Sequence, residues 1–244
     1  MLSRSGHEGP GGIVVSVLID VTDPSDARLA DFVGLRDAQL RRADGGRFIA
    51  EGVKIIERAL AAGCRPRSLL LQPRWLPGVE PLLARWPGVP VFVATEALIE
   101  RVSGFHVHRG ALGSFDRPAE ASWESIAHGR RVIVCEEIVD HANMGAIIRV
   151  AAGLGWDAVV VSPGSADPLY RRAVKASMGA SLSLPWRRMD SDDDLARLAR
   201  ITDSVRTYSA AEFPELPALA QQFDLRLSMG VWLDHRLANK EAEI

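Results

Sequence analysis

The sequence predicts an α/β protein, because short apolar segments that favour strands alternate with segments of helical periodicity. In the N-terminal half, the predicted strands cover residues 47–50, 68–72, 89–94 and 111–115. In the C-terminal half, an apolar run at 132–135 leads into a helical pattern and a second run at 159–161 leaves it. This alternation is typical of sheets that are covered by helices.

Each helical segment carries a local signal at one of its ends. Asp23-Pro24-Ser25 begins the first predicted helix and residues 44–46 end it. The apolar stripe of this helix is Leu29, Phe32, Val33 and Leu40. The helix that follows the strand at 47–50 ends at Gly63, and Thr95 is the predicted N-cap of the helix at 95–102.

A polar stretch that contains a proline divides the two halves. We therefore predict a first domain at 20–116, a linker at 117–129 and a second domain at 130–244. The apolar run at 13–19 is too short to cross a membrane, so no membrane association is predicted. Cys64 and Cys135 form no C-x-x-C motif, and this favours a reducing, cytoplasmic location.

The formal net charge of −2 gives no overall indication of nucleic-acid binding, but two local clusters are basic. They comprise Arg36, Arg41, Arg42, Arg47 and Lys54, and Arg171, Arg172 and Lys175. Both clusters are compatible with phosphate contacts and with solvated helix faces. His106 and His108 form an H-x-H pair that lacks an evident third ligand, so no metal site is predicted.

Residues 140–161 hold the most unusual pattern of the chain. Asn143 is a good N-cap for a helix at 145–154, whose predicted core stripe is Ile147, Val150, Ala151 and Leu154. Another face carries Gly145, Arg149, Ala152 and Gly153, where only the arginine is large. Another backbone or a second subunit can approach such a face closely. The alternative interpretation is that no backbone or subunit approaches this face, and that Arg149 is a solvated arginine on the outside of the helix.

Three polar or glycine-bearing segments follow predicted strands or lie near them: 140–144, 162–168 and 177–179. If 182–186 is a third strand, these segments meet at the carboxyl edge of a sheet, where α/β proteins bind ligands. The letters G-x-G-x-x-A at 153–158 resemble a dinucleotide loop, but they follow a helix and precede a strand. Gly153 and Gly155 are better interpreted as the end of the helix.

Residues 140–186 closely resemble the first motif block of the SpoU (TrmH-type) RNA ribose 2′-O-methyltransferases. That block reads Asn-x-Gly-x-x-x-Arg, then a strand, then Ser-x-Gly, and Asn143, Gly145, Arg149, Ser177 and Gly179 stand at these positions. The segments 23–42, 48–60 and 108–115 also resemble the family's substrate-binding domain. The resemblance implies a small ribosomal-protein-like α/β domain, followed by an α/β-knot domain of the SPOUT type.

The resemblance further implies methyl transfer from S-adenosylmethionine to a ribose 2′-hydroxyl of rRNA or tRNA by a homodimer. Asn143 and Arg149 would then be catalytic. The residues implied to bind substrate are Gly145, Ser177, Gly179, Arg47 and Glu51. Arginine stays protonated with a pKa above about 12, so Arg149 suits electrostatic stabilisation of a developing alkoxide rather than proton abstraction.

Two later motifs of the family, Gly-x-Glu-x-Gly and Ser-Leu-Asn-Val, are missing from residues 190–244. We therefore expect an α/β-knot domain that is incomplete at its C-terminus, and no cofactor-binding residue is assigned. The alternative function is that of a catalytically inactive, RNA-binding remnant of the family. A third hypothesis, an unrelated nucleotide-binding α/β enzyme that uses residues 153–158, has the wrong structural context.

Overall fold

A computed structural model describes residues 17–35, 46–107 and 110–190, the backbone of 204–207 and 226–229, and the single residues 218 and 221. The chain divides into two compact units. The first comprises residues 1–119, 138–154 and 166–184, and the second comprises 120–137, 155–165 and 185–244. The predicted α/β fold class is confirmed.

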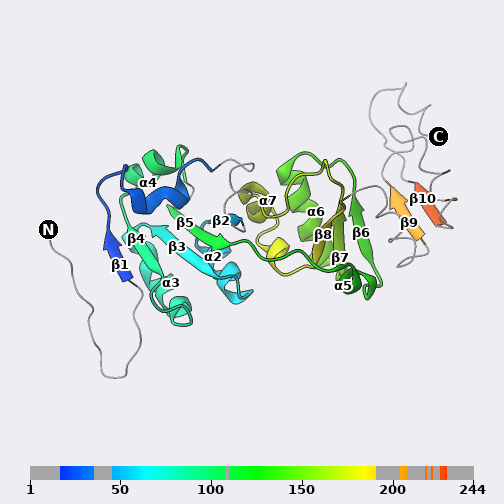
Figure 1. The fold of residues 1–244 in the computed structure, drawn as a ribbon, viewed down its shortest axis with the longest axis horizontal. Helices are drawn as coiled ribbons and strands as arrows, with labels where there is room; N and C mark the ends of the chain where they lie inside the picture. The colour runs from blue at the N-terminus through cyan, green and yellow to red at the C-terminus, as the bar shows by residue number, and fades with distance from the viewer. Residues whose placement is uncertain are drawn as a thin grey trace. The chain divides into compact units, whose positions relative to one another are not determined.

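A five-stranded sheet forms the centre of the first unit (Figure 1). Its strands, in spatial order, are β1 (Val17–Asp20), β4 (Pro90–Val93), β3 (Pro66–Leu71), β5 (Ala111–Asp116) and β2 (Arg47–Glu51). β5 is antiparallel to both of its neighbours, and the other adjacent pairs are parallel. The carboxyl ends of β2, β3 and β4 therefore lie at one edge of the sheet, where β5 begins.

Helices cover both faces of this sheet. The 3₁₀ helix η1 (Ala27–Phe32) and α4 (Glu96–Ser103) share one hydrophobic core with the sheet. Helix α2 (Val53–Ala61) packs against β2, β5 and α3 (Leu76–Leu83), which follows the short η2 (Pro73–Trp75). The predicted N-cap Thr95 is confirmed, because its side chain accepts a hydrogen bond from the backbone N–H of Leu98.

The predicted first helix is only partly correct. Asp26, rather than Asp23 to Ser25, caps η1, and Leu29 and Phe32 are buried as expected, whereas Val33 is half exposed. Leu40 and residues 44–45, which were predicted to continue and end this helix, lie outside the described residues, as do Arg36, Arg41 and Arg42.

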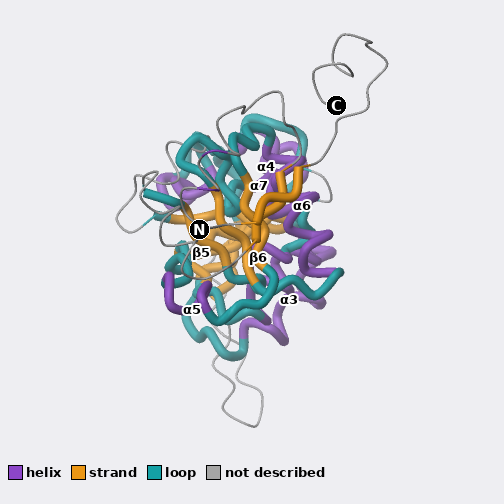
Figure 2. The backbone as a smooth tube through the Cα atoms, turned by 90° about the vertical axis from the view of Figure 1, so that its right-hand side faces the viewer, coloured by secondary structure: helices purple, strands orange, loops and turns teal. Residues whose placement is uncertain are grey.

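The first unit also contains α6 (His141–Gly153), α7 (Arg171–Ala176) and η3 (Ala180–Leu182). Helix α6 is in contact with both α7 and η3, and α7 is in contact with β2. Figure 2 shows α6 as one continuous helix of several turns. Two helices that follow the second unit's strands in sequence therefore group with the N-terminal sheet.

A three-stranded parallel sheet forms the second unit, in the order β6 (Val132–Cys135), β7 (Ala158–Val161) and β8 (Trp186–Arg188). Helix α5 (Trp123–Ala127) contributes Ile126 to the core of this unit. β9 (Ser204–Thr207) and β10 (Arg226–Met229) form a separate parallel pair. The third strand begins at Trp186, and not at residue 182, because Pro185 has no N–H to donate to a ladder.

The two cysteines are free and buried, and burial raises the pKa of the Cys135 thiol to about 12. Within the described ranges, no helix is long and apolar enough to cross a membrane. Those ranges also contain no group of three or more His, Cys, Asp or Glu side chains that could hold a metal ion. His106 bonds Glu100 at 2.8 Å, while His108 lies outside them.

Candidate functional site

Helix α6 begins four residues earlier than predicted, and its N-cap lies three residues earlier. Asp140 is its N-cap, and the Asp140 carboxylate accepts a hydrogen bond from the backbone N–H of Asn143 at 2.8 Å. Asn143 is therefore inside the first helical turn, with an exposed side chain, and is not the cap. Residues 141–144, which were predicted as a loop, belong to the helix. An Asp and an Asn three residues apart are both good caps, so local sequence does not choose between them.

The buried side of α6 also differs from the prediction. Met144, Gly145, Ile148 and Ala151 are the buried residues of this helix. Ala151 was predicted correctly, but Val150 and Leu154 have exposed fractions of 57% and 64% and do not belong to a core. This helix carries apolar residues on more than one face, and its periodicity alone therefore does not identify the buried one.

Gly145 lies where α6 crosses α7. A Cβ atom added to Gly145 would collide with the carbonyl oxygen of Ala173 and would approach Ala176 and the backbone of Ser177. The predicted close approach to another backbone is confirmed at this residue, and the partner is α7 of the same chain. At Gly153, by contrast, an added Cβ would meet nothing within 4 Å.

Arg149 lies on the exposed side of α6. Among the described residues, its guanidinium makes no hydrogen bond and no ion pair. Ala146, Ala152 and Gly153 are exposed small residues of the same helix. Arg149 is thus a strong, permanently charged donor that protrudes from a surface of small side chains.

Ser177 and Gly179 lie in a tight turn between α7 and η3. The Ser177 hydroxyl is buried and donates to the carbonyl oxygen of Val174 at 2.9 Å. Gly179 has φ of +81°, which few other residues adopt, and it packs against the aliphatic part of Arg58. The Arg58 guanidinium in turn donates to the carbonyl oxygen of Met178. These contacts hold the turn that connects α7 and η3.

Glu51 joins the N-terminal sheet to α7. Its side chain is buried, and its carboxylate accepts hydrogen bonds from Lys175 Nζ at 2.5 Å and from Arg171 Nη1 at 3.3 Å. The Arg171 guanidinium also lies 4.0 Å from the ring centroid of Phe105. Glu51 therefore pairs with two cations of the second basic cluster and offsets one of their two charges, while Arg172 and Lys175 are the exposed members of the cluster.

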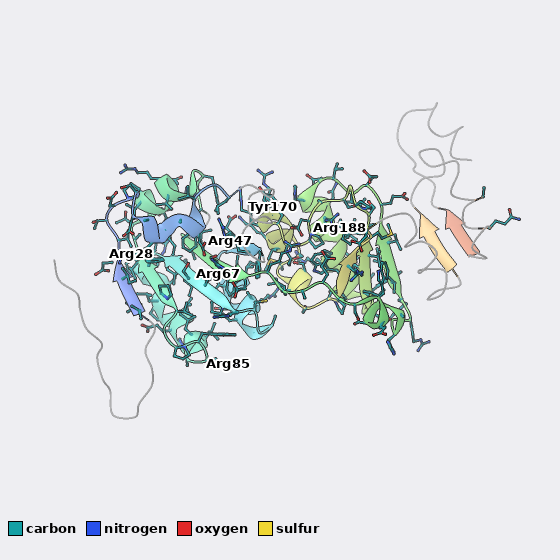
Figure 3. All side chains as sticks on the ribbon, in the orientation of Figure 1. Arg28, Arg47, Arg67, Arg85, Tyr170 and Arg188 are labelled. Atoms are coloured by element: carbon teal, nitrogen blue, oxygen red, sulfur yellow. The ribbon has the colours of Figure 1, made fainter. Side chains whose placement is uncertain are left out.

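Arg47 lies in a second charge cluster with Asp31 and Arg67 (Figure 3). Burial acts to raise the pKa of Asp31. The hydrogen bonds from Arg67 and Ser114 and the charges of Arg67 and Arg47 act in the opposite direction and outweigh burial, so the pKa lies below its ordinary value. A cavity of about 600 Å³ adjoins Arg47. Its lining comprises Pro24, Ser25, Asp26, Ala27, Ala30, Val33, Gly34 and Arg47.

In the second unit, the loop after β7 is held by polar groups that sequence reasoning did not single out. The Ser162 hydroxyl accepts from the Glu137 N–H at 3.0 Å and donates to the Glu137 carboxylate at 3.2 Å. Arg188 Nη1 donates to the carbonyl oxygens of Ser162 and Ser165 at 2.7 and 2.8 Å. The positions of Glu137 and Arg188, at the carboxyl ends of β6 and β8, are the signal that could have identified them.

Residues 130–225 match the SpoU rRNA Methylase family, and residues 30–112 match the MRM3-like substrate binding domain. An uncharacterized tRNA/rRNA methyltransferase of Mycobacterium tuberculosis is 42% identical over 184 residues, which are 73% of this chain and 62% of that protein. The human mitochondrial rRNA methyltransferase 3 is 26% identical over 175 residues, covering 68% of this chain and 40% of the human protein. The chain thus spans less than two thirds of the length of these relatives.

Among solved structures, an AdoMet-bound rRNA methyltransferase from Sinorhizobium meliloti aligns with a TM-score of 0.74 and 19% identity. The alignment covers 92% of this chain and 95% of that one. The SpoU methyltransferase AviRb from Streptomyces viridochromogenes, in complex with AdoMet, aligns with a TM-score of 0.61 and 20% identity, covering 89% and 95%. At such identities the likeness shows the fold.

Proposed function

Because residues 130–225 match the SpoU rRNA Methylase family, we propose that the chain transfers a methyl group from S-adenosylmethionine to a ribose 2′-hydroxyl of rRNA or tRNA. The observation that carries this proposal is the state of Arg149. Its guanidinium is exposed and without a partner among the described residues, and small side chains surround it. It is thus available to a polyanionic substrate, which a neutralised arginine is not.

The chemistry of the acceptor explains why a cation is needed. A ribose hydroxyl is a very weak acid, and it must release its proton, here to water, as its oxygen attacks the methyl carbon. Negative charge therefore develops on the oxygen as that proton leaves. A positioned guanidinium stabilises that charge as it develops, or it fixes the neighbouring phosphate. Arg149 is proposed to act in this way, and the exposed amide of Asn143, in the first turn of the same helix, is proposed to orient the ribose.

The other residues assigned to the substrate divide by their environment. Gly145, Ser177, Gly179 and Glu51 are buried and in contact with α6, α7 or the turn after α7. We propose that these four serve the substrate by holding α6 and α7 in place. Arg47 adjoins a cavity and is proposed to contact RNA phosphate.

S-adenosylmethionine supplies an electrophilic methyl group on a sulfonium centre. In the described part of the second unit, the polar groups at the carboxyl ends of β6, β7 and β8 bond one another, as Ser162, Glu137 and Arg188 do. Residue 230, near which the family's second motif would begin, lies outside the described residues. No residue is assigned to the cofactor, and no catalytic step is derived through it.

We also propose that the chain acts as a homodimer. Val139, Val150 and Leu154 have exposed fractions of 67%, 57% and 64%, and the last two lie one helical turn apart. Exposed apolar side chains at this spacing form a stripe that a second copy can cover. Sedimentation equilibrium of the full chain and of Val150→Lys tests this proposal, and a monomeric wild type contradicts it.

A second candidate is RNA binding without methyl transfer, and one observation favours it: residues 190–244 lack the Gly-x-Glu-x-Gly and Ser-Leu-Asn-Val motifs. Such a chain would bind rRNA or tRNA with an affinity that does not depend on S-adenosylmethionine.

The deciding experiment combines calorimetric titration of the purified chain with S-adenosylmethionine and filter binding to rRNA and tRNA with and without the cofactor. Methyl transfer is then measured as protection of the RNA from alkaline cleavage, which needs a free 2′-hydroxyl. Saturable cofactor binding and new protected positions support the methyltransferase. RNA binding with no cofactor heat from a folded chain supports the second candidate and contradicts the first.

A further inference from the structure

Helix α7 carries more positive charge than its surroundings offset. Arg171, Arg172 and Lys175 lie among its six residues, and its first turn contains no acidic residue. Glu51 pairs with Arg171 and Lys175, so one carboxylate faces two cations. Arg172 is exposed, and among the described residues it makes no hydrogen bond and no ion pair. Three cations and one carboxylate leave a formal charge of +2 on this surface.

The position of Arg172 is unfavourable for its own helix. Tyr170 is the N-cap of α7, so Arg172 is the second helical residue. The N-terminus of a helix carries partial positive charge, which repels a cation in the first turn. Arg171, in the same turn, is compensated by Glu51, whereas the described part of the chain offers Arg172 no such partner. A residue that breaks a local preference without compensation is typical of a site that serves a ligand.

Arg172 also borders the place where α7 packs against α6. Positions three and four residues apart lie on one side of a helix, so Arg172 lies between Lys175 and Ala176 on the surface of α7. Ala176 faces α6, because an added Cβ at Gly145 would lie 2.7 Å from the Ala176 Cβ. Arg149 follows Gly145 by four residues and lies beside the same junction. Two exposed guanidiniums are thus carried by one packed pair of helices.

The surrounding helices add positive charge. Arg58 of α2 bonds the turn that follows α7, and Lys54 of α2 pairs with Glu57. Together with Glu51 and the N-cap Asp140, helices α2, α6 and α7 hold six cations and three carboxylates, a formal charge of +3, whereas the whole chain has −2. Such a local concentration of positive charge attracts a polyanion. The polyanion of the proposed function is RNA, whose phosphate oxygens match the donors of a guanidinium.

We propose that Arg172 binds a backbone phosphate of the RNA substrate. Its guanidinium donates to the phosphate oxygens, and the charge of Lys175 beside it adds to the attraction. A phosphate contact fixes the position of a strand and reads no base, so Arg172 would hold the strand that Arg149 is proposed to contact. This proposal rests on the proposed function, because it requires that the chain bind RNA. It adds a residue outside the Asn-x-Gly-x-x-x-Arg and Ser-x-Gly motifs.

The test measures filter binding of the full chain to rRNA or tRNA over a series of salt concentrations. For Arg172→Ala, we expect the slope of log K against log salt to become shallower by about 0.7 to 0.9, as the loss of one phosphate contact requires. Affinity at low salt should fall about five- to tenfold. Arg172→Lys should keep the slope, because lysine also pairs with phosphate as a point charge.

The matched control is Arg85→Ala, which removes the same charge from another exposed site of the same unit. Figure 3 shows Arg85 well apart from Tyr170, the N-cap of α7. Arg85→Ala should leave slope and affinity unchanged. Equal slopes for Arg172→Ala and Arg85→Ala overturn the phosphate site while RNA binding itself stands. If the wild type binds no RNA, the proposed RNA substrate fails and the phosphate site fails with it.

Urea unfolding separates this role from a structural one. Because the charge of Arg172 is unfavourable at the start of α7, Arg172→Ala should unfold at the same urea concentration as the wild type or at a higher one. A lower midpoint, or a chain that does not fold, would mean that Arg172 stabilises α7, and would overturn the proposal.

Discussion

The two faces of α6 differ in what surrounds them. On one face, Met144, Gly145, Ile148 and Ala151 are buried, and Gly145 admits the backbone of α7. On the other face, Arg149, Val150 and Gly153 are exposed, and no described residue lies within 4 Å of an added Cβ at Gly153. One helix therefore carries a packing residue and the proposed catalytic residue four positions apart. A motif that reads as one block divides into a structural part and a part that is available to substrate.

The largest expected effect is a loss of stability in Gly145→Val. Its side chain must displace α7, so we expect the free energy of unfolding to fall by about 3 kcal/mol. Gly153→Ala is the matched control in the same helix and should raise it by up to about 1 kcal/mol, since alanine favours a helix over glycine. Urea unfolding measures both. Similar losses in the two variants would contradict the difference between the two faces of α6. If Gly145→Val does not fold, Gly145→Ala should give a smaller loss.

A second, smaller effect tests how α7 is held against the N-terminal sheet. Glu51→Gln removes the charge that pairs with Lys175 and Arg171 and leaves the shape unchanged. Because these are charge-assisted hydrogen bonds to a buried carboxylate, we expect a loss of about 2 kcal/mol in unfolding free energy.

The matched control for Glu51→Gln is Glu57→Gln. Its partner Lys54 is largely exposed, and such pairs contribute about 0.5 kcal/mol or less. If Glu51→Gln has the same free energy of unfolding as the wild type, the ion pairs do not hold α7.

The smallest effect is a pH dependence that arises away from α6. The pKa of Asp31 is lower in the folded chain than in the unfolded one, so its ionised form stabilises the fold above the unfolded pKa. That contribution is lost as the pH falls below about 4 and through the lower folded value. Asp31→Asn should therefore lose less stability than the wild type between pH 6 and pH 2 in urea unfolding. If the unfolding free energies of the wild type and of Asp31→Asn fall in parallel between pH 6 and pH 2, Asp31 makes no such contribution.

Local signals predicted the elements that depend on nearby residues. Thr95 caps α4, Gly63 follows the end of α2 with φ of +78°, and the strand at 111–115 lies within β5. The buried face of α6 could not be predicted in this way, because a helix rotates by about 100° per residue and this one has apolar residues on several faces. In the folded chain, the contact between Gly145 and α7 determines which face of α6 is buried.

The residues of the candidate site also divide into those that the sequence could predict and those that it could not. The presence of Asn143, Gly145 and Arg149 on one helix could be predicted from their spacing. The pairing of Glu51 with Lys175 could not, because 124 positions separate them and the sequence contains no signal that couples the two. Gln72 was also missed, since only the folded sheet shows that its amide nitrogen is buried without a partner among the described residues.

The most direct test of the central claim is to measure methyl transfer and stability together in the wild type, Arg149→Ala and Arg149→Lys. Since Arg149 is exposed, both variants should unfold at the same urea concentration as the wild type. Methyl transfer to the RNA 2′-hydroxyl should fall by about 10²- to 10³-fold in Arg149→Ala, as when a donor to a developing oxyanion is removed. Arg149→Lys should recover only part of it, because lysine lacks the fork of donors. Full activity in either variant, or a wild type that binds RNA without methylating it, would contradict the assignment of Arg149 to the reaction.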